Sequence, residues 1–181
     1  SFTIAVANAN DAPTITSTAV TTATEDAAYT YTVTASDADG DTLTMTGTTV
    51  PSWLSFNAAT GVLSGTPANA NVGTSGNAVL ITVTDGNNGQ VTDSFTITVT
   101  NTNDAPTVAN AISDASTDED AAYSLSISNV FTDVDSGDSC TYSMSGAPST
   151  ITLSSGTISG TPVNANVGAH TITVSCSDGA L

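Results

Sequence analysis

The chain has 181 residues, with 17 Asp and Glu residues and no Lys or Arg, so its formal net charge is −17. Such an acidic surface repels the phosphates of nucleic acids and anionic membrane faces, so no nucleic-acid partner is expected. No apolar run reaches the roughly 18 residues that a membrane-spanning helix needs, and we expect no membrane insertion.

Along the chain, apolar residues alternate with Thr or Ser, which predicts short half-buried strands. In the first half these strands are expected at about 14–22, 29–35, 42–49, 52–56, 61–65, 78–84 and 95–99. Turn clusters such as Asp39-Gly40-Asp41 separate them, and no stretch has a helical period. We therefore predict an all-β fold of two tandem Greek-key antiparallel β-sandwiches.

The second half of the chain repeats the first at a shift of 93 to 97 residues. The Asn-Asp-Ala-Pro sequence of residues 10–13 recurs at 103–106, and its proline cannot donate to a strand ladder, so it marks a joint between modules. The predicted organisation is the last strand of a preceding repeat plus a linker at 1–12, a first repeat at 13–105, and a second repeat at 106–181 that lacks its own last strand.

The first six residues, Ser1–Val6, match Ser94–Val99, the last strand of the first repeat. Two interpretations of this match stay open. In one, the chain is an excerpt from a longer tandem array. In the other, it is a self-polymerising subunit whose residues 1–6 complete the sheet of a neighbouring copy by β-augmentation.

Acidic residues keep their positions in both repeats. Seven pairs, or fourteen of the seventeen acids, superpose: Asp11 with Asp104, Glu25 with Glu119, Asp26 with Asp120, Asp37 with Asp133, Asp39 with Asp135, Asp41 with Asp138, and Asp85 with Asp178. Successive antiparallel strands alternate in direction, so chain position fixes the end of the sandwich at which an acid lies. Glu25 and Asp104 are thus expected at the end of the first module that faces Asp133, Asp135 and Asp178 of the second.

Carboxylates gathered at one joint require a cation, because two unit charges about 4 Å apart repel by about 4 kcal/mol at an effective dielectric near 20. Oxygen ligands without His or Cys nearby favour Ca²⁺ over Zn²⁺ or copper, and a flexible multi-carboxylate site favours Ca²⁺ over octahedral Mg²⁺. The alternative is that these acids only cap turns and solvate loops.

The remaining distinctive side chains point to structure more than to chemistry. Cys140 and Cys176 replace inward-facing residues on strands expected to be neighbours, so they are a disulfide candidate; the alternative is two buried free thiols. His170 is the only histidine and has no identifiable nucleophile, so no catalytic residue and no enzyme activity are predicted. Trp53 and Phe56 could stack on a sugar, although core packing is the favoured interpretation.

Several motifs occur in a shared order and spacing across nearly the whole chain. They are Glu25-Asp26, Ala35-Ser36-Asp37-Ala38-Asp39-Gly40-Asp41, Pro51-Ser52-Trp53-Leu54-Ser55-Phe56, residues 60–67 (TGVLSGTP), Val83-Thr84-Asp85-Gly86 and Asn103-Asp104-Ala105-Pro106. Together they resemble a cadherin-type repeat, and specifically the dystroglycan-type cadherin-like repeats of large bacterial surface proteins. The resemblance implies a cadherin/Ig-like sandwich in an extracellular or bacterial cell-surface protein, where Ca²⁺ at each joint rigidifies a stalk or filament.

The resemblance also implies which residues bind the metal. The junction ligands would be Glu25, Asn103, Asp104, Asp133, Asp135 and Asp178. An upstream half-site would contain Asp11, Asp37, Asp39 and Asp85, and a downstream half-site Glu119 and Asp120. The Asp-Arg-Glu segment of cadherins is replaced here by residues 65–71, and Asn101 stands where cadherin linkers often have Asp. With fewer carboxylates than in cadherins, we expect one to three ions per joint.

The expected partners are neighbouring repeats or copies of the chain itself, with glycans or cell-surface proteins as further candidates. Two other functions remain open beside the calcium-binding stalk. One is a carbohydrate-binding module, which predicts an exposed Trp53. The other is a filament subunit assembled by donor-strand exchange of residues 1–6.

Overall fold

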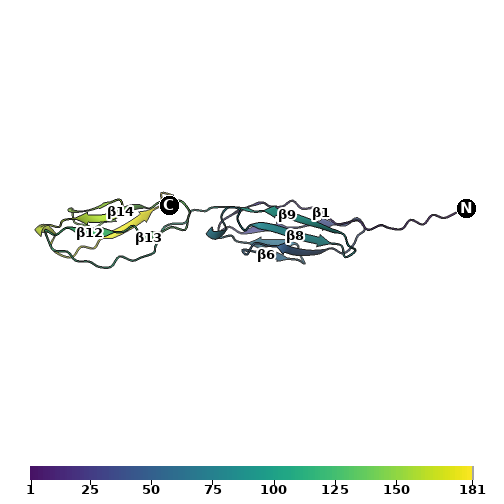
Figure 1. Cartoon of the computed structure of the whole chain (residues 1–181), viewed down its shortest axis with the longest axis horizontal. Helices are drawn as coiled ribbons and strands as arrows, with labels where there is room; N and C mark the ends of the chain where they lie inside the picture. Colours follow the sequence, from purple (N-terminus) through teal and green to yellow (C-terminus); the bar gives the residue numbers. More distant parts are fainter. Residues whose placement is uncertain (181) are drawn as a thin grey trace. The chain divides into compact units, whose positions relative to one another are not determined.

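The computed structural model describes residues 1–180, which form two compact units, residues 1–102 and residues 103 onward. Each unit is built from short strands (Figure 1). Within residues 1–180 each unit also contains one short 3₁₀ helix, η1 (Asn69–Asn71) in the first and η2 (Asn164–Asn166) in the second. Among the residues described, no helix has the length and apolar character needed to cross a bilayer. The all-β prediction is therefore confirmed.

The first unit contains ten strands. They are β1 (Thr14–Ile15), β2 (Thr22–Thr24), β3 (Tyr29–Thr32), β4 (Ala35–Ser36), β5 (Thr44–Thr49), β6 (Leu54–Asn57), β7 (Val62–Gly65), β8 (Ala78–Thr84), β9 (Gln90–Thr96) and β10 (Thr98–Thr100). Two antiparallel sheets, β3-β7-β6 and β5-β8-β9, supply most of the pairing. Two short pairs complete the unit: β1 with β4, antiparallel, and β10 with β2, parallel.

Several details of this unit differ from the sequence prediction. The strand expected at 29–35 is interrupted after Thr32, and Ala35–Ser36 form the separate strand β4. The single strand expected at 14–22 is divided into β1 and β2, because the chain first pairs with β4 and then crosses to pair with β10. The strand expected at 95–99 is divided at Ile97. Its first part belongs to β9, which begins at Gln90 and pairs with β8, and its last part belongs to β10, which pairs with β2. The parallel β10-β2 pair was not predicted.

The core of the first unit joins residues from both of its large sheets. Tyr29 and Tyr31 of β3, Leu63 of β7, and Val79 and Ile81 of β8 are all buried, as strict alternation along each strand requires. The indole of Trp53 packs edge-on against the ring of Tyr29 at a centroid distance of 5.7 Å. Trp53 is thus half-buried against the core rather than exposed, contrary to what the carbohydrate-binding alternative requires.

The second unit repeats this plan with fewer strands. They are β11 (Thr107–Val108), β12 (Tyr123–Ser126), β13 (Phe131–Thr132), β14 (Thr141–Ser145), β15 (Ile151–Ser154), β16 (Thr157–Gly160) and β17 (Thr173–Ser177). They pair antiparallel as β12-β16-β15, β14-β17 and β11-β13. The buried core is small and consists of Ile127, Val130, Ile151 and Ile158. A disulfide joins Cys140 to Cys176 beside the β14-β17 pair, with 5.4 Å between their Cα atoms.

Candidate functional site

Three carboxylates converge in the loop that follows β4 in the first unit. Asp37, Asp39 and Asp41 each offer an oxygen within 4.8 Å of the others. Oδ1 of Asp37 accepts the backbone N–H groups of Asp39 (2.9 Å) and Asp41 (3.3 Å), which curls the loop around this carboxylate. Oδ2 of Asp37 is buried and has no hydrogen-bond partner within residues 1–180. A buried acceptor without a donor is unusual, and this loop is therefore the first candidate for a cation site.

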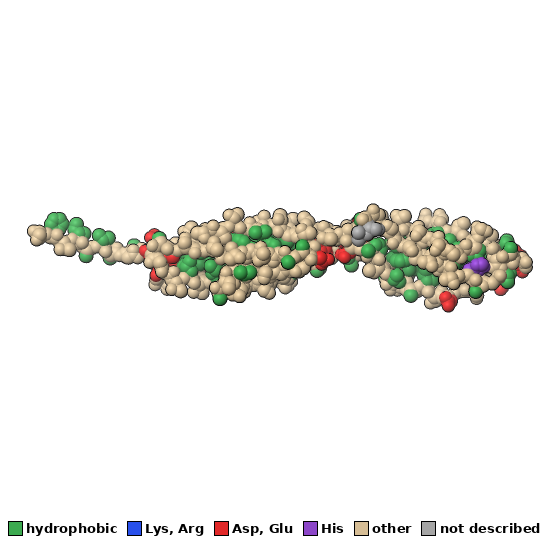
Figure 2. Space-filling view, turned by 180° about the vertical axis from the view of Figure 1, so that it is seen from behind, with side chains coloured by type: hydrophobic (Ala, Val, Ile, Leu, Met, Phe, Trp, Pro, Cys, Tyr) green, Lys and Arg blue, Asp and Glu red, His purple; other side chains and the backbone are tan. Residues whose placement is uncertain are grey.

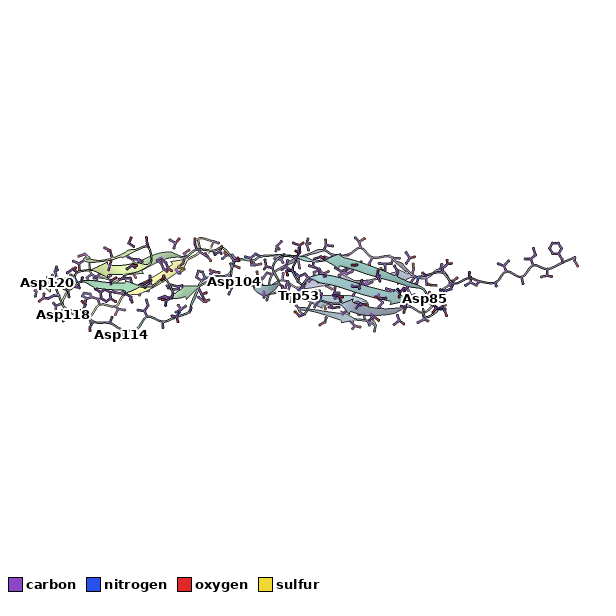
Figure 3. The ribbon with its side chains drawn as sticks, in the orientation of Figure 1. Trp53, Asp85, Asp104, Asp114, Asp118 and Asp120 are labelled. Atoms are coloured by element: carbon purple, nitrogen blue, oxygen red, sulfur yellow. A yellow bond between two sulfur atoms is a disulfide. The ribbon has the colours of Figure 1, made fainter. Side chains whose placement is uncertain are left out.

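The linker that precedes the first unit lies against the same loop. Asn8 donates its side-chain amide to Oδ1 of Asp39 (2.8 Å), and the backbone N–H of Asp11 donates to Oδ2 of Asp39 (2.7 Å). Asn10 donates in the same way to Oδ2 of Asp85 (2.8 Å), a residue at the end of β8 that Figure 3 labels. The structure thus brings together the predicted upstream half-site, to which Asp11 contributes its backbone N–H.

Hydrogen bonds to two of these carboxylates stabilise their ionised forms. The backbone N–H of Asp11, helped by the amide of Asn8, lowers the pKa of Asp39. The side chain of Asn10 lowers the pKa of Asp85, and backbone N–H groups of the following turn add to the effect. Both groups are therefore charged acceptors near neutral pH.

The second unit reproduces this arrangement at equivalent positions. Asn103 donates its amide to Oδ2 of Asp178 (3.0 Å), and the backbone N–H of Asp104 donates to Oδ2 of Asp135 (2.7 Å). Oδ1 of Asp133 accepts the N–H of Asp135 (2.9 Å), while Oδ2 of Asp133 is buried without a hydrogen-bond partner among the described residues. The same orphaned oxygen thus appears in both repeats.

A fourth carboxylate, which the predicted ligand sets omitted, joins the cluster of the second unit. Asp133, Asp138 and Asp178 each offer an oxygen within 4.8 Å of the others. The pKa of Asp138 is raised, first by desolvation and then by the negative charges of Asp133, Asp135 and Asp178. The sequence did hold a signal for this residue, because Asp138 superposes on Asp41 in the repeat.

Glu25 occupies a different place, at the turn after β2. It is only 2% exposed, and its Oε2 accepts the backbone N–H of Thr102 (3.2 Å), while its carbonyl accepts the hydroxyl of the same residue (3.1 Å). Glu25 is thus tied to the last linker residue of the first unit. No described contact within that unit joins it to the loop of Asp37 and Asp39.

The turn that holds Glu25 recurs in the second unit. Asp26 and its counterpart Asp120 both adopt a left-handed backbone conformation, with φ of 58° and 61°. Their N–H groups donate to the carbonyls of Pro67 (2.9 Å) and Pro162 (2.8 Å). The predicted downstream half-site, Glu119 and Asp120, therefore lies in the turn of the second unit that is equivalent to the Glu25 turn of the first, although Glu119 is exposed. Figure 3 shows Asp120 at the opposite end of the second unit from Asp104.

The single histidine takes no part in these clusters. His170 is exposed, and its Nε2 lies 2.8 Å from the carbonyl oxygen of Asn166, a residue of η2. Most of the acids lie instead in loops near the ends of the units, where Figure 2 shows acidic side chains in red.

Two β-sandwiches in tandem, each with an Asn-Asp linker hydrogen-bonded to acidic loops, define a protein of the immunoglobulin-like and cadherin-like repeat class. The sequence profile of the family described as Putative Ig domain (He_PIG) matches residues 12–100 and 105–180, so the chain belongs to that family.

Known proteins are similar to this chain in sequence and in fold. The "Serine-rich adhesin for platelets" of Staphylococcus aureus (strain MRSA252) is 39% identical over 136 residues, which is 74% of this chain but only 9% of the adhesin. Human protocadherin-24 EC1-2 has a TM-score of 0.54 at 22% identity, over 93% of this chain and 94% of that one. A second crystal form gives 0.56 at 17% identity, over 93% and 95% of the two chains. These structural likenesses establish the fold alone.

The family model that matches describes an immunoglobulin-like domain, and the absence of enzyme activity stays a prediction. The family found is the Ig-like one; the dystroglycan-type assignment stays a prediction.

Proposed function

We propose that this chain is part of an extracellular adhesive protein of the bacterial cell surface, in which Ca²⁺ bound at the linkers holds successive repeats rigidly as a stalk. Adhesion and surface location are supported by the staphylococcal adhesin, of which this chain matches a small part. Calcium binding is supported by the chemistry of the acidic loops.

The observation that carries the calcium proposal is the pair of orphaned oxygens, Oδ2 of Asp37 and Oδ2 of Asp133. A buried carboxylate oxygen without a donor is costly, and the chain has no Lys or Arg that could neutralise it. A bound cation would supply the contact that each of these oxygens lacks, and it would offset the repulsion between neighbouring carboxylates. The groups that cluster with Asp37 and Asp133 are carboxylates, and such a cluster suits Ca²⁺.

The proposed ligands follow from the loops of each unit. In the second unit they are the side chains of Asn103, Asp104, Asp133, Asp135, Asp138 and Asp178, and Glu25 of the first unit is proposed to complete the joint. Asp37, Asp39, Asp41 and Asp85, with Asp11, would serve an upstream joint, and Glu119 with Asp120 a downstream one. A bound ion that joins ligands of two units reduces hinge motion between them, which is the mechanical role proposed here. We expect one to three ions at each joint.

The test is a Ca²⁺ titration of chelator-treated protein by isothermal calorimetry, with melting temperature and radius of gyration as further readouts. Bound Ca²⁺ should raise the melting temperature and reduce the radius of gyration, at dissociation constants of about 0.1 to 1 mM, the range of extracellular sites. Asp133→Asn should weaken the second-unit site at least tenfold. Asp114→Asn, an exposed acid outside the clusters, is the matched control.

Glu25→Gln separates a site shared between units from one confined to the second unit. It should abolish the change in radius while much of the heat remains. An unchanged melt and no heat at several millimolar Ca²⁺ would refute calcium binding altogether.

A further inference from the structure

The disulfide of the second unit lies next to the acidic loops of the same unit. Cys140 follows Asp138 by two residues, and Cys176 precedes Asp178 by two. Cys140 lies just before the first residue of β14, and Cys176 lies near the last residue of β17, which is its antiparallel partner. The disulfide therefore joins the two chain segments from which the acidic loops extend.

Both cysteines also line a hollow that they share with the acids. This hollow has a volume of about 280 Å³. Its lining includes Asp133, Asp135, Asp138, Cys140 and Cys176. Carboxylate oxygens of Asp133, Asp138 and Asp178 lie within 4.8 Å of one another, so the loops that carry them repel each other. The disulfide is a covalent bond that opposes this repulsion at its source.

The first unit holds its equivalent loops without a crosslink. Leu43 and Val83 stand where the second unit has Cys140 and Cys176. Val83 is fully buried, and the strand that carries it, β8, pairs with β5 on one side and with β9 on the other. The first unit is thus a natural reference without a disulfide, present in the same molecule.

We propose that the Cys140–Cys176 disulfide is a redox-sensitive crosslink that sets the Ca²⁺ affinity of the second unit. This role presupposes the calcium site proposed for that unit. In the oxidised chain the crosslink holds the loop of Asp133 and Asp138 beside Asp178, at the spacing that a cation requires. In the reduced chain the acids push this end of the β14-β17 ladder apart, so the arrangement that binds Ca²⁺ is populated for only part of the time.

The size of the effect follows from that population. If reduction leaves the binding arrangement populated about a tenth of the time, the apparent dissociation constant rises about tenfold. Coupling between two equilibria is reciprocal, so bound Ca²⁺ would make the disulfide about tenfold harder to reduce.

The reductant is an added dithiol, and the reaction is a two-electron exchange. One thiolate of the dithiol attacks a protein sulfur, and the S–S bond breaks. The second thiolate then releases the dithiol as its own cyclic disulfide. The two protons of the dithiol end on the sulfurs of Cys140 and Cys176, which become thiols.

The experiment is a Ca²⁺ titration of the isotope-labelled 181-residue chain, with and without dithiothreitol, followed by backbone amide resonances. Gly40 and Gly86 report the acidic loops of the first unit, and Gly137 and Gly179 report those of the second. All four resonances should shift with Ca²⁺ in the oxidised chain. Reduction should raise the dissociation constant seen by Gly137 and Gly179 about tenfold and leave that seen by Gly40 and Gly86 unchanged.

A second measurement uses the reciprocal effect. The equilibrium constant for reduction by dithiothreitol should fall about tenfold at saturating Ca²⁺.

A variant with a moved crosslink separates local positioning from general stabilisation of the unit. Ser145 and Thr173 are exposed and directly opposite each other at the other end of the β14-β17 ladder. Opposite residues of an antiparallel pair have the Cα spacing that a disulfide needs. The variant therefore combines Cys140→Leu and Cys176→Val with Ser145→Cys and Thr173→Cys, which closes a loop of similar length. It should be as stable as the parent but bind Ca²⁺ in the second unit as weakly as the reduced chain.

Three results would count against the proposal. A second-unit affinity that does not change on reduction overturns it and leaves the calcium site standing. A moved-crosslink variant that binds Ca²⁺ like the parent also overturns it, because the disulfide would then act only through the stability of the unit. If none of the four glycine resonances shifts at several millimolar Ca²⁺, the calcium site itself is refuted, and this proposal with it.

Discussion

Breaking the Cys140–Cys176 disulfide should destabilise the second unit and leave the first unchanged. The disulfide spans a separation of 36 residues, for which the chain-entropy relation gives about 3 to 4 kcal/mol of stabilisation. The second unit relies on a small buried core, so this contribution is a large share of the roughly 4 to 12 kcal/mol expected for its length. For a domain of this size the loss corresponds to a fall in melting temperature of roughly 10 to 30 °C.

The two units can be followed separately in the same sample. Trp53 is the only tryptophan and belongs to the first unit, so its fluorescence reports the unfolding of that unit alone. Circular dichroism reports both units, so under reducing conditions it should show an early transition that the Trp53 signal lacks. A double variant, Cys140→Leu with Cys176→Val, carries the residues found at these positions in the first repeat and should behave like the reduced protein.

Two results would contradict this reasoning. One is a circular-dichroism midpoint that does not move on reduction, which would mean that the crosslink constrains little. The other is a shift of the Trp53 transition as large as that of the early one, which would mean that the two units unfold together.

Three further predictions concern the first unit and are checked by urea or pH titration of Trp53 fluorescence. Asn77 is 1% exposed and accepts the indole N–H of Trp53 at 2.9 Å. Asn77→Leu should therefore cost about 2 to 4 kcal/mol, because it leaves buried polar groups unpaired. Gly65→Ala should cost about 1 to 3 kcal/mol, since an added Cβ would overlap the backbone oxygen of Trp53. Thr92→Ala, on an exposed face of β9, is the control for both and should change stability by less than about 0.5 kcal/mol. Burial raises the pKa of Tyr29 to about 12. The stability that the neutral phenol gives the folded unit is therefore fully present below pH 10.0, the ordinary pKa, and is lost as the pH rises towards 12. Tyr29→Phe should shift the alkaline unfolding midpoint upward, and an unchanged midpoint would argue against this role of the phenol.

The sequence predicted most of the fold because its strands alternate clearly. Residues 29–32 and 78–84 alternate between core and solvent as expected. The division of 14–22 into two strands could not be predicted, because it depends on pairing with β4 and β10, which are distant in the chain. The start of β9 at Gln90 was missed for the same reason, since backbone pairing with β8 holds a stretch whose side chains are largely polar.

For the candidate site, the equivalent positions of the acids in the two repeats predicted more than the residue types alone. Superposing the repeats identified the Asp133 and Asp135 loop before its shape was known. It did not reveal that one oxygen of Asp133 would be buried without a donor, since that depends on how backbone N–H groups curl the loop around the other oxygen. Asp138 lies outside the ligand sets that the cadherin resemblance implies, although it superposes on Asp41 in the repeat and joins the cluster of Asp133 and Asp178.

The asparagines of the linkers have a consequence for how an ion would enter. Asn10 and Asn103 donate their amides to the equivalent carboxylates Asp85 and Asp178, so hydrogen bonds hold each linker against its acidic loop. A side-chain amide has a donor end and an acceptor end, and a half turn about its last bond presents its oxygen in place of its nitrogen. Binding of a cation would then replace the hydrogen bond between each Asn and its Asp by a contact from the Asn oxygen to the cation, and the linker would already be ordered. Little conformational entropy would be lost, and the rotation of two amides would be visible as a shift of their side-chain nitrogen resonances.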